Sequence, residues 1–76
     1  MKGQLVYDLA LASFLAATGH KILSVKSDEK KSAFTFQQTE QLEKDILSFF
    51  NREGRVDPLG YSEMLRNLKA LAMQRR

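Results

Sequence analysis

The stretch that decides the fold runs from residue 21 to residue 38, as two arms around a polar loop. It reads Lys21-Ile-Leu-Ser-Val-Lys-Ser27, then Asp28-Glu-Lys-Lys31, then Ser32-Ala-Phe-Thr-Phe-Gln-Gln38. Apolar and polar side chains alternate in both arms, which is typical of strands with one buried face. The four loop residues fit an ordinary hairpin connection. Because the flanking sequence is helical in pattern, we predict an α+β fold in the order helix, β-hairpin, helix, helix.

The alternation also predicts which hairpin side chains face the core. Leu23 and Val25 of the first arm share one face with Phe34 and Phe36 of the second arm. Ile22 is then the one apolar residue on the opposite, solvent-facing side. Since two strands alone are only marginally stable, the hairpin is expected to pack on helices or on another copy of the chain.

The helix before the hairpin is predicted to begin after Asp8, a good N-cap, and to end at Gly19. It is apolar on most of its sides, so we place it at the centre of the fold. Thr39 is expected to cap a second helix that ends at Gly54. Leu47 and Phe50 are expected to widen the inward stripe of that helix.

A third helix is predicted from Asp57 as N-cap and Pro58 at the first helical position. Helical spacing and strand alternation together predict one hydrophobic core for the whole chain. The expected core residues are Leu11, Phe14, Leu15, Leu23, Val25, Phe34, Phe36, Leu42, Ile46, Phe49, Leu65 and Leu68.

Length and composition narrow the class of protein. The 76 residues make a single domain, residues 1–76. The chain has no cysteine, which excludes disulfides, thiol catalysis and cysteine-based zinc sites. The longest nearly apolar stretch, residues 9–17, is about half of what a membrane span needs. We therefore expect a soluble, cytoplasmic protein with no membrane association.

The sequence offers no recognisable catalytic, metal or cofactor site. His20 is the only histidine, and it has no acidic residue near it in sequence. The carboxylates are scattered, and the glycines do not cluster into a phosphate-binding loop. We expect no enzyme activity, no cofactor and no bound metal.

The charge distribution supports a nucleic-acid-binding hypothesis. Residues 39–53 carry a net charge of −2, whereas residues 1–38 and 54–76 carry +2 and +3. A basic hairpin tip and a basic last helix can contact phosphates, although the same lysines also fit solvated edge protection. The candidate nucleic-acid contacts are Lys26, Lys30, Lys31, Lys69, Arg75 and Arg76.

A protein-association hypothesis is preferred to nucleic-acid binding. The last helix has a wider apolar arc than one neighbouring element needs, and edge strands can pair with another chain. The candidate partner surface comprises Ile22, Tyr61, Met64, Leu71 and Met73. The leading prediction is a small non-enzymatic binding protein that associates with itself or with another protein; the alternative is a nucleic-acid-binding accessory protein.

Four segments of the chain are similar to a known family. They read Asp8-Leu-Ala-Leu-Ala-Ser-Phe-Leu15, Gly19-His-Lys21, Arg55-Val-Asp-Pro58 and Leu65-Arg-Asn-Leu-Lys69. In these segments the chain resembles small uncharacterised bacterial and phage proteins that form a domain of unknown function. The resemblance implies a stand-alone bacterial or phage-encoded protein, and it supplies no catalytic or binding residues.

Overall fold

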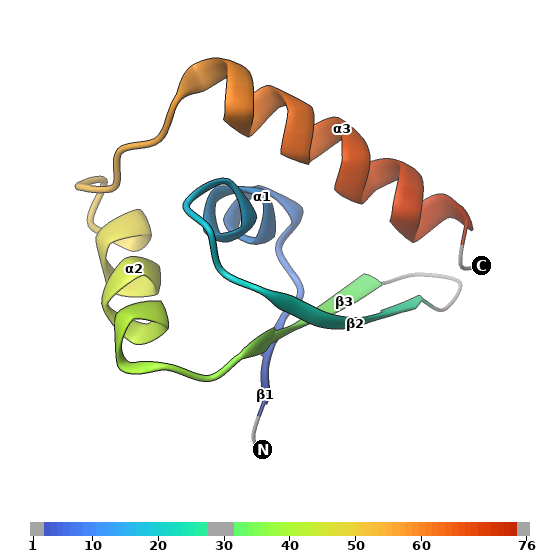
Figure 1. Ribbon diagram of the computed structural model, residues 1–76, viewed down its shortest axis with the longest axis horizontal. Coiled ribbons are helices and arrows are strands. Elements are labelled where there is room, and N and C mark those ends of the chain that lie inside the picture. The colour runs from blue at the N-terminus through green and yellow to red at the C-terminus, as the bar shows by residue number, and fades with distance from the viewer. Residues whose placement is uncertain (1–2, 28–31, 75–76) are drawn as a thin grey trace.

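The described residues of the chain fold into three helices and a three-stranded sheet, which confirms the α+β class (Figure 1). The structure is a computed structural model that describes residues 3–27 and 32–74. Helix, hairpin, helix and helix follow in the predicted order, but a further strand precedes them. The elements are β1 (Gly3–Val6), α1 (Leu9–Ala17), β2 (Ile22–Ser27), β3 (Ser32–Gln37), α2 (Glu40–Phe50) and α3 (Pro58–Gln74).

The sheet is antiparallel, with the strand order β1-β3-β2. β3 is therefore the central strand and is paired on both sides. Its Phe34 lies between Val6 of β1 and Val25 of β2, and its Phe36 lies between Gln4 and Ile22. Both phenylalanines are almost completely buried, so the middle of the sheet supplies two of the largest core side chains.

A bulge in β2 changes the predicted orientation of its first residues. The pairing of β2 with β3 shifts between Ile22 and Ser24, so Leu23 is an extra residue that the partner strand does not match. The predicted inward position of Leu23 is wrong, because its side chain is 43% exposed. The predicted solvent-facing position of Ile22 is wrong as well, since this residue packs against the core. Strict alternation fails wherever a strand holds an unmatched residue.

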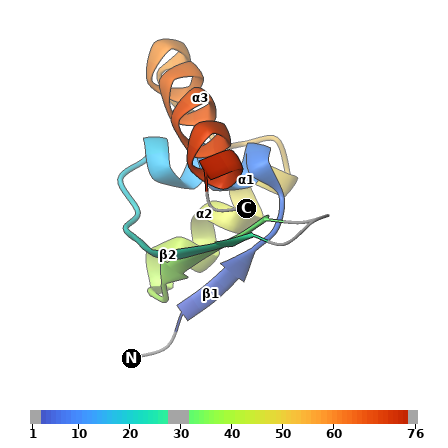
Figure 2. The same ribbon diagram turned by 90° about the vertical axis from the view of Figure 1, so that its right-hand side faces the viewer.

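Helix α1 lies at the centre of the molecule, as predicted from its apolar sequence. Figures 1 and 2 show it between α3 and the sheet, and it also contacts α2. Five consecutive residues, Leu11 to Leu15, are buried. Asp8 caps the helix, because its carboxylate accepts hydrogen bonds from the backbone N–H groups of Ala10 and Leu11 at 2.8 and 3.3 Å. Ser13, buried inside the helix, donates its hydroxyl to the Leu9 carbonyl at 2.8 Å.

The C-terminus of α1 is closed by a Schellman motif that fixes the start of the hairpin. Gly19 takes a φ of 106°, in the left-handed region that favours glycine. Its N–H bonds the Ala16 carbonyl, and the N–H of His20 bonds the Leu15 carbonyl at 3.0 Å. This confirms the predicted end of the helix and holds His20 beside it.

Helix α2 begins at the predicted cap, Thr39, but ends before the predicted glycine. Arg52 takes the left-handed conformation, with φ of 60°, and the Glu53 N–H bonds the Ser48 carbonyl at 2.8 Å. Gly54, which was expected to end the helix, has a different role. A Cβ atom at this position would lie 2.5 Å from Cζ of Phe14, so the glycine lets the loop pass close to that ring.

Most of the predicted core is confirmed, and two residues of α2 are not part of it. Leu42, Ile46 and Phe49 face inward, whereas Leu47 and Phe50 are each 63% exposed. The expectation that these two widen the inward stripe is wrong, because they lie on a flank of α2 that no described helix or strand covers. The buried core comprises Val6, Leu11, Ala12, Phe14, Leu15, Val25, Phe34, Phe36, Leu42 and Leu68.

The first prediction tests the core with a matched pair of leucines. Leu42→Ala empties a fully buried position on α2 and should lower the free energy of unfolding by about 2–5 kcal/mol. Leu59→Ala removes the same atoms from a side chain of α3 that is 76% exposed. This variant should change the free energy of unfolding by less than about 0.5 kcal/mol. Urea titrations of both variants measure the difference. Equal losses would contradict the assignment of Leu42 to the core.

The second prediction compares two glycines. Gly54→Ala should lower the free energy of unfolding by about 1–3 kcal/mol, because the added methyl group collides with Phe14. Gly60→Ala, in the first turn of α3, meets only Asp57 at an ordinary distance. It should raise stability by about 0.5–1 kcal/mol, since alanine favours helix over glycine. Thermal melts of the two variants should therefore shift in opposite directions.

Candidate functional site

The only histidine of the chain, which lies just after α1, makes a short contact with an acidic residue of α2. His20 Nε2 lies 2.5 Å from Oδ2 of Asp45 on α2, and the two side chains are 12% and 21% exposed. Gln41, one turn earlier on α2, donates to the other carboxylate oxygen at 2.9 Å. The pair joins the end of α1 to α2. Sequence reasoning missed it because 25 residues separate the partners.

The surroundings of Asp45 favour its charged form. Partial burial by itself raises the pKa of the Asp45 carboxyl, but the hydrogen bonds from His20 and Gln41 and the charge of His20 outweigh burial. The pKa therefore lies below its ordinary value. A metal site needs at least three such ligands, and among the described residues no further acidic side chain joins His20 and Asp45 in a group that could hold a metal ion. The geometry fits a tether between α1 and α2.

The predicted nucleic-acid contacts are brought together only in part. Lys26, near the end of β2, and Lys69, late in α3, are both exposed. α3 packs against β2, and Figures 1 and 2 show the C-terminal end of α3 beside the hairpin end of the sheet. These two lysines therefore lie at one end of the molecule. The other four candidates, Lys30, Lys31, Arg75 and Arg76, lie outside the described residues.

The predicted partner surface is divided between the core and the exterior. Ile22 and Tyr61 are half-buried and pack against the core, so they offer less surface than predicted. Met64 is also half-buried. Leu71 and Met73 of α3 are exposed, as the hypothesis requires.

An apolar surface that the residue pattern did not predict lies on the outer face of the sheet. Val6 of β1 faces the core, so by strand alternation Leu5 faces away from it and lies opposite Thr35. Leu5 is 46% exposed, and the bulge adds Leu23 to the same outer face. A Cβ atom on Gly3 would lie against the side chains of Thr35 and Leu23, which places all three on one surface. Helices cover the opposite face of the sheet (Figure 1).

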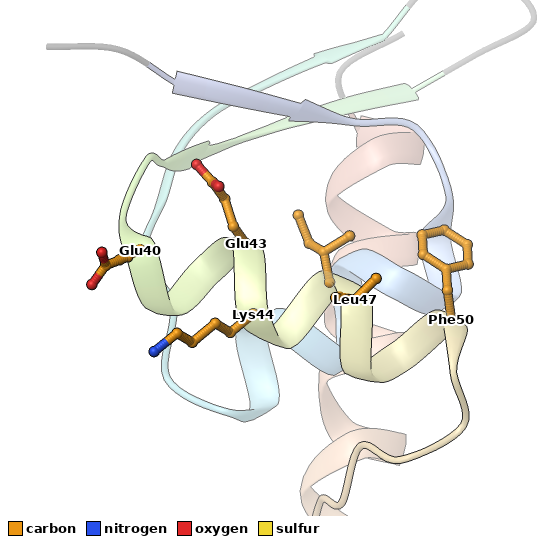
Figure 3. Close-up of a pocket in the computed structure, with 6 residues that line it drawn as sticks. Glu40, Glu43, Lys44, Leu47 and Phe50 are labelled. Carbon is orange, nitrogen blue, oxygen red and sulfur yellow. The ribbon is translucent and has the colours of Figure 1, made fainter.

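Two of the open surface depressions formed by the described residues are relevant to binding. One, of about 420 Å³, lies along α2 and is shown in Figure 3. Its lining residues are Glu40, Glu43, Lys44, Ile46, Leu47 and Phe50. The other, of about 350 Å³, lies where the loop after α2 passes over the Phe14 ring. Both are lined mainly by apolar atoms, and the first has carboxylates at one end.

These features define a small α+β domain with a central helix and a sheet that is open on one face. A family described as Domain of unknown function (DUF5659) matches residues 3–74, so the chain belongs to this family. The resemblance predicted from the sequence is thereby confirmed. No curated protein and no solved structure matches the chain. Within the part of the chain that the structure describes, no helix is long and apolar enough to cross a membrane.

The third prediction concerns the pH dependence of the His20–Asp45 contact. Because folding lowers the pKa of Asp45, its contribution to stability is present above the unfolded-state value of about 3.9. The contribution is lost as the pH falls through the lower, folded-state value. Asp45→Asn should therefore reduce the free energy of unfolding by about 1–3 kcal/mol at neutral pH and by progressively less in acid. Denaturant titrations across a pH series measure this.

The control for that prediction is Glu63→Gln on α3. Glu63 is exposed, so its neutralisation should change stability by less than about 0.5 kcal/mol across the series. A constant difference between the parent and Asp45→Asn at every pH would contradict the role given to the carboxylate.

Proposed function

We propose that the chain is a small non-enzymatic protein that acts by associating with another protein chain, in the first place a second copy of itself. The observation that carries this proposal is the sheet, which has helices on one face and exposes Leu5 of the edge strand β1 on the other. A further pair, Leu47 and Phe50, is exposed on α2. A chain of 76 residues has a small core, and association is a common way for such chains to bury more apolar surface.

The side chains that could perform chemistry support binding more than catalysis. The one histidine is engaged with Asp45, and the depressions on the surface are lined mainly by apolar atoms. The absence of cysteine favours a reducing compartment, so we place the protein in the cytoplasm.

Nucleic-acid binding is a second candidate function, favoured by one observation. The packing of α3 on β2 brings Lys26 and Lys69 to the same end of the molecule. Two basic side chains on neighbouring elements can contact successive phosphates of one strand.

The fourth prediction tests self-association directly. In sedimentation equilibrium over a series from micromolar to millimolar protein, the weight-average mass should rise from one chain of 8.7 kDa towards two. The expected stoichiometry is two, because closed twofold dimers are the commonest homo-oligomers. A single-chain mass at every concentration would exclude self-association.

The fifth prediction tests the nucleic-acid candidate through salt. If all six predicted basic residues contact phosphates, the log–log dependence of affinity on salt should have a slope of about −5 on duplex DNA. Replacing Lys26 and Lys69 with glutamine should make that slope shallower by about 2. Fluorescence anisotropy of a labelled random duplex measures it, with Lys44→Gln on α2 as the matched control. If the double variant binds the duplex with the affinity and salt dependence of the parent, nucleic-acid binding through these lysines is excluded.

A further inference from the structure

We propose that β1 pairs through its free edge with β1 of a second copy, antiparallel, so that two three-stranded sheets become one continuous sheet. This inference rests on the proposed self-association and names the surface that performs it. β1 is an edge strand whose main contacts are with β3 and α1. In an antiparallel ladder alternate residues direct their N–H and C=O groups away from the partner strand. β1 therefore presents hydrogen-bonding groups that a further strand can use.

The two edges of the sheet are protected to different degrees. Lysine side chains and bulges discourage unwanted pairing at an edge. The β2 edge has both, with Lys26 within the strand and the bulge at Leu23. β1 has neither within Gly3–Val6, and these four residues include no charged residue and no proline. A lysine directly precedes each strand in the sequence, Lys2 before β1 and Lys21 before β2, so these two lysines do not distinguish the edges. The difference points to the β1 edge as the side on which another strand is accommodated.

A second copy of this chain is the occupant that fits this edge. Antiparallel pairing of β1 with itself satisfies a twofold axis, which gives a closed dimer and not an open filament. Because the strand is neutral, no like charges meet across the axis. The nearest charge that follows, Asp8, is engaged in capping α1.

Side chains next to β1 supply the contact area that a four-residue strand lacks. Leu5 lies on the outer face of the sheet, where it would meet its copy across the axis. On the helical face, Asp45 orients one side of α2 towards His20, which lies between α1 and β2. Leu47 and Phe50 lie on the other flank, and Figure 3 shows them pointing to the side on which β1 runs.

The two copies of α2 would lie on the same face of the joined sheet, because the twofold axis is perpendicular to it. The depression of about 420 Å³ beside Leu47 and Phe50 then faces the partner and can receive its side chains. A stable interface of standard size buries about 800 Å² per partner. That is about one seventh of the 5608 Å² surface of this chain.

The experiment places a positive or a negative charge at Leu5, next to the proposed twofold axis, and then mixes the two variants. Leu5→Lys and Leu5→Glu are each expected to weaken self-association by at least about tenfold, because identical charges meet across the axis. An equimolar mixture of the two variants is expected to restore association, since opposite charges then meet. Sedimentation equilibrium of each variant and of the mixture gives the dissociation constants. Circular dichroism and thermal melts at low concentration check that each variant folds.

The matched control is Leu23→Lys with Leu23→Glu. Leu23 is exposed to a similar extent on the same outer face, but it belongs to β2 at the opposite edge. The proposal is supported if the Leu23 variants dimerise with dissociation constants within about threefold of the parent value. It also requires that mixing the two charge variants restores association at Leu5 and has no such effect at Leu23. If the parent dimerises but substitutions at Leu5 and Leu23 weaken the dimer equally, β1 pairing is contradicted and self-association is not. The same holds if substitutions at neither position weaken the dimer. A parent that is monomeric throughout overturns both.

Discussion

Helix α1 imposes the constraint on which the rest of the structure depends, since it has no polar side to turn towards water. Nine residues long and buried over its middle five, it must be covered from every direction. The sheet covers it from below, α3 from above and α2 from the side (Figure 1). Each of these elements has one apolar stripe or face, and each directs it to α1. The order of elements along the chain matters less than this requirement.

Covering a central helix with so short a chain leaves surfaces elsewhere unfinished. α2 and α3 both pack on α1, and the helices lie on one face of the sheet, so none of the described helices is left to cover the other face. The flank of α2 that carries Leu47 and Phe50 is open for the same reason. Exposed apolar groups are ordinary on protein surfaces when they are scattered. In this protein some of these exposed apolar groups lie beside an edge strand whose backbone can pair with a further strand. The two features together define a surface suited to association.

The features that local sequence encodes were predictable, and those that depend on distant pairing were not. Asp8, Thr39 and Asp57 begin the helices as expected, because a capping side chain bonds the backbone a few residues away. The inward positions of Leu42, Ile46 and Phe49 on α2 followed from their spacing, although the wider stripe expected to include Leu47 and Phe50 did not form. β1 has four residues and becomes a strand only because β3 is available to pair with it.

The candidate site was the least predictable part for the same reason. The bulge at Leu23 has no signature in a regular alternating pattern, and it exchanged the exposures expected for Leu23 and Ile22. The contact between His20 and Asp45 depends on a turn and a helix packing that the residue types alone do not specify. Of the predicted basic surface, only Lys26 and Lys69 could be placed.

The strand order β1-β3-β2 also sets an order in time. β2 and β3 are neighbours in sequence, so their pairing closes only a short loop. β1 must wait, since Gly3 pairs with Gln37 and most of the first half of the chain has to be made and folded before that contact exists. During synthesis the first strand to emerge is thus the last to find its place in the sheet. Until it does, the central strand with its two buried phenylalanines has an open side of its own.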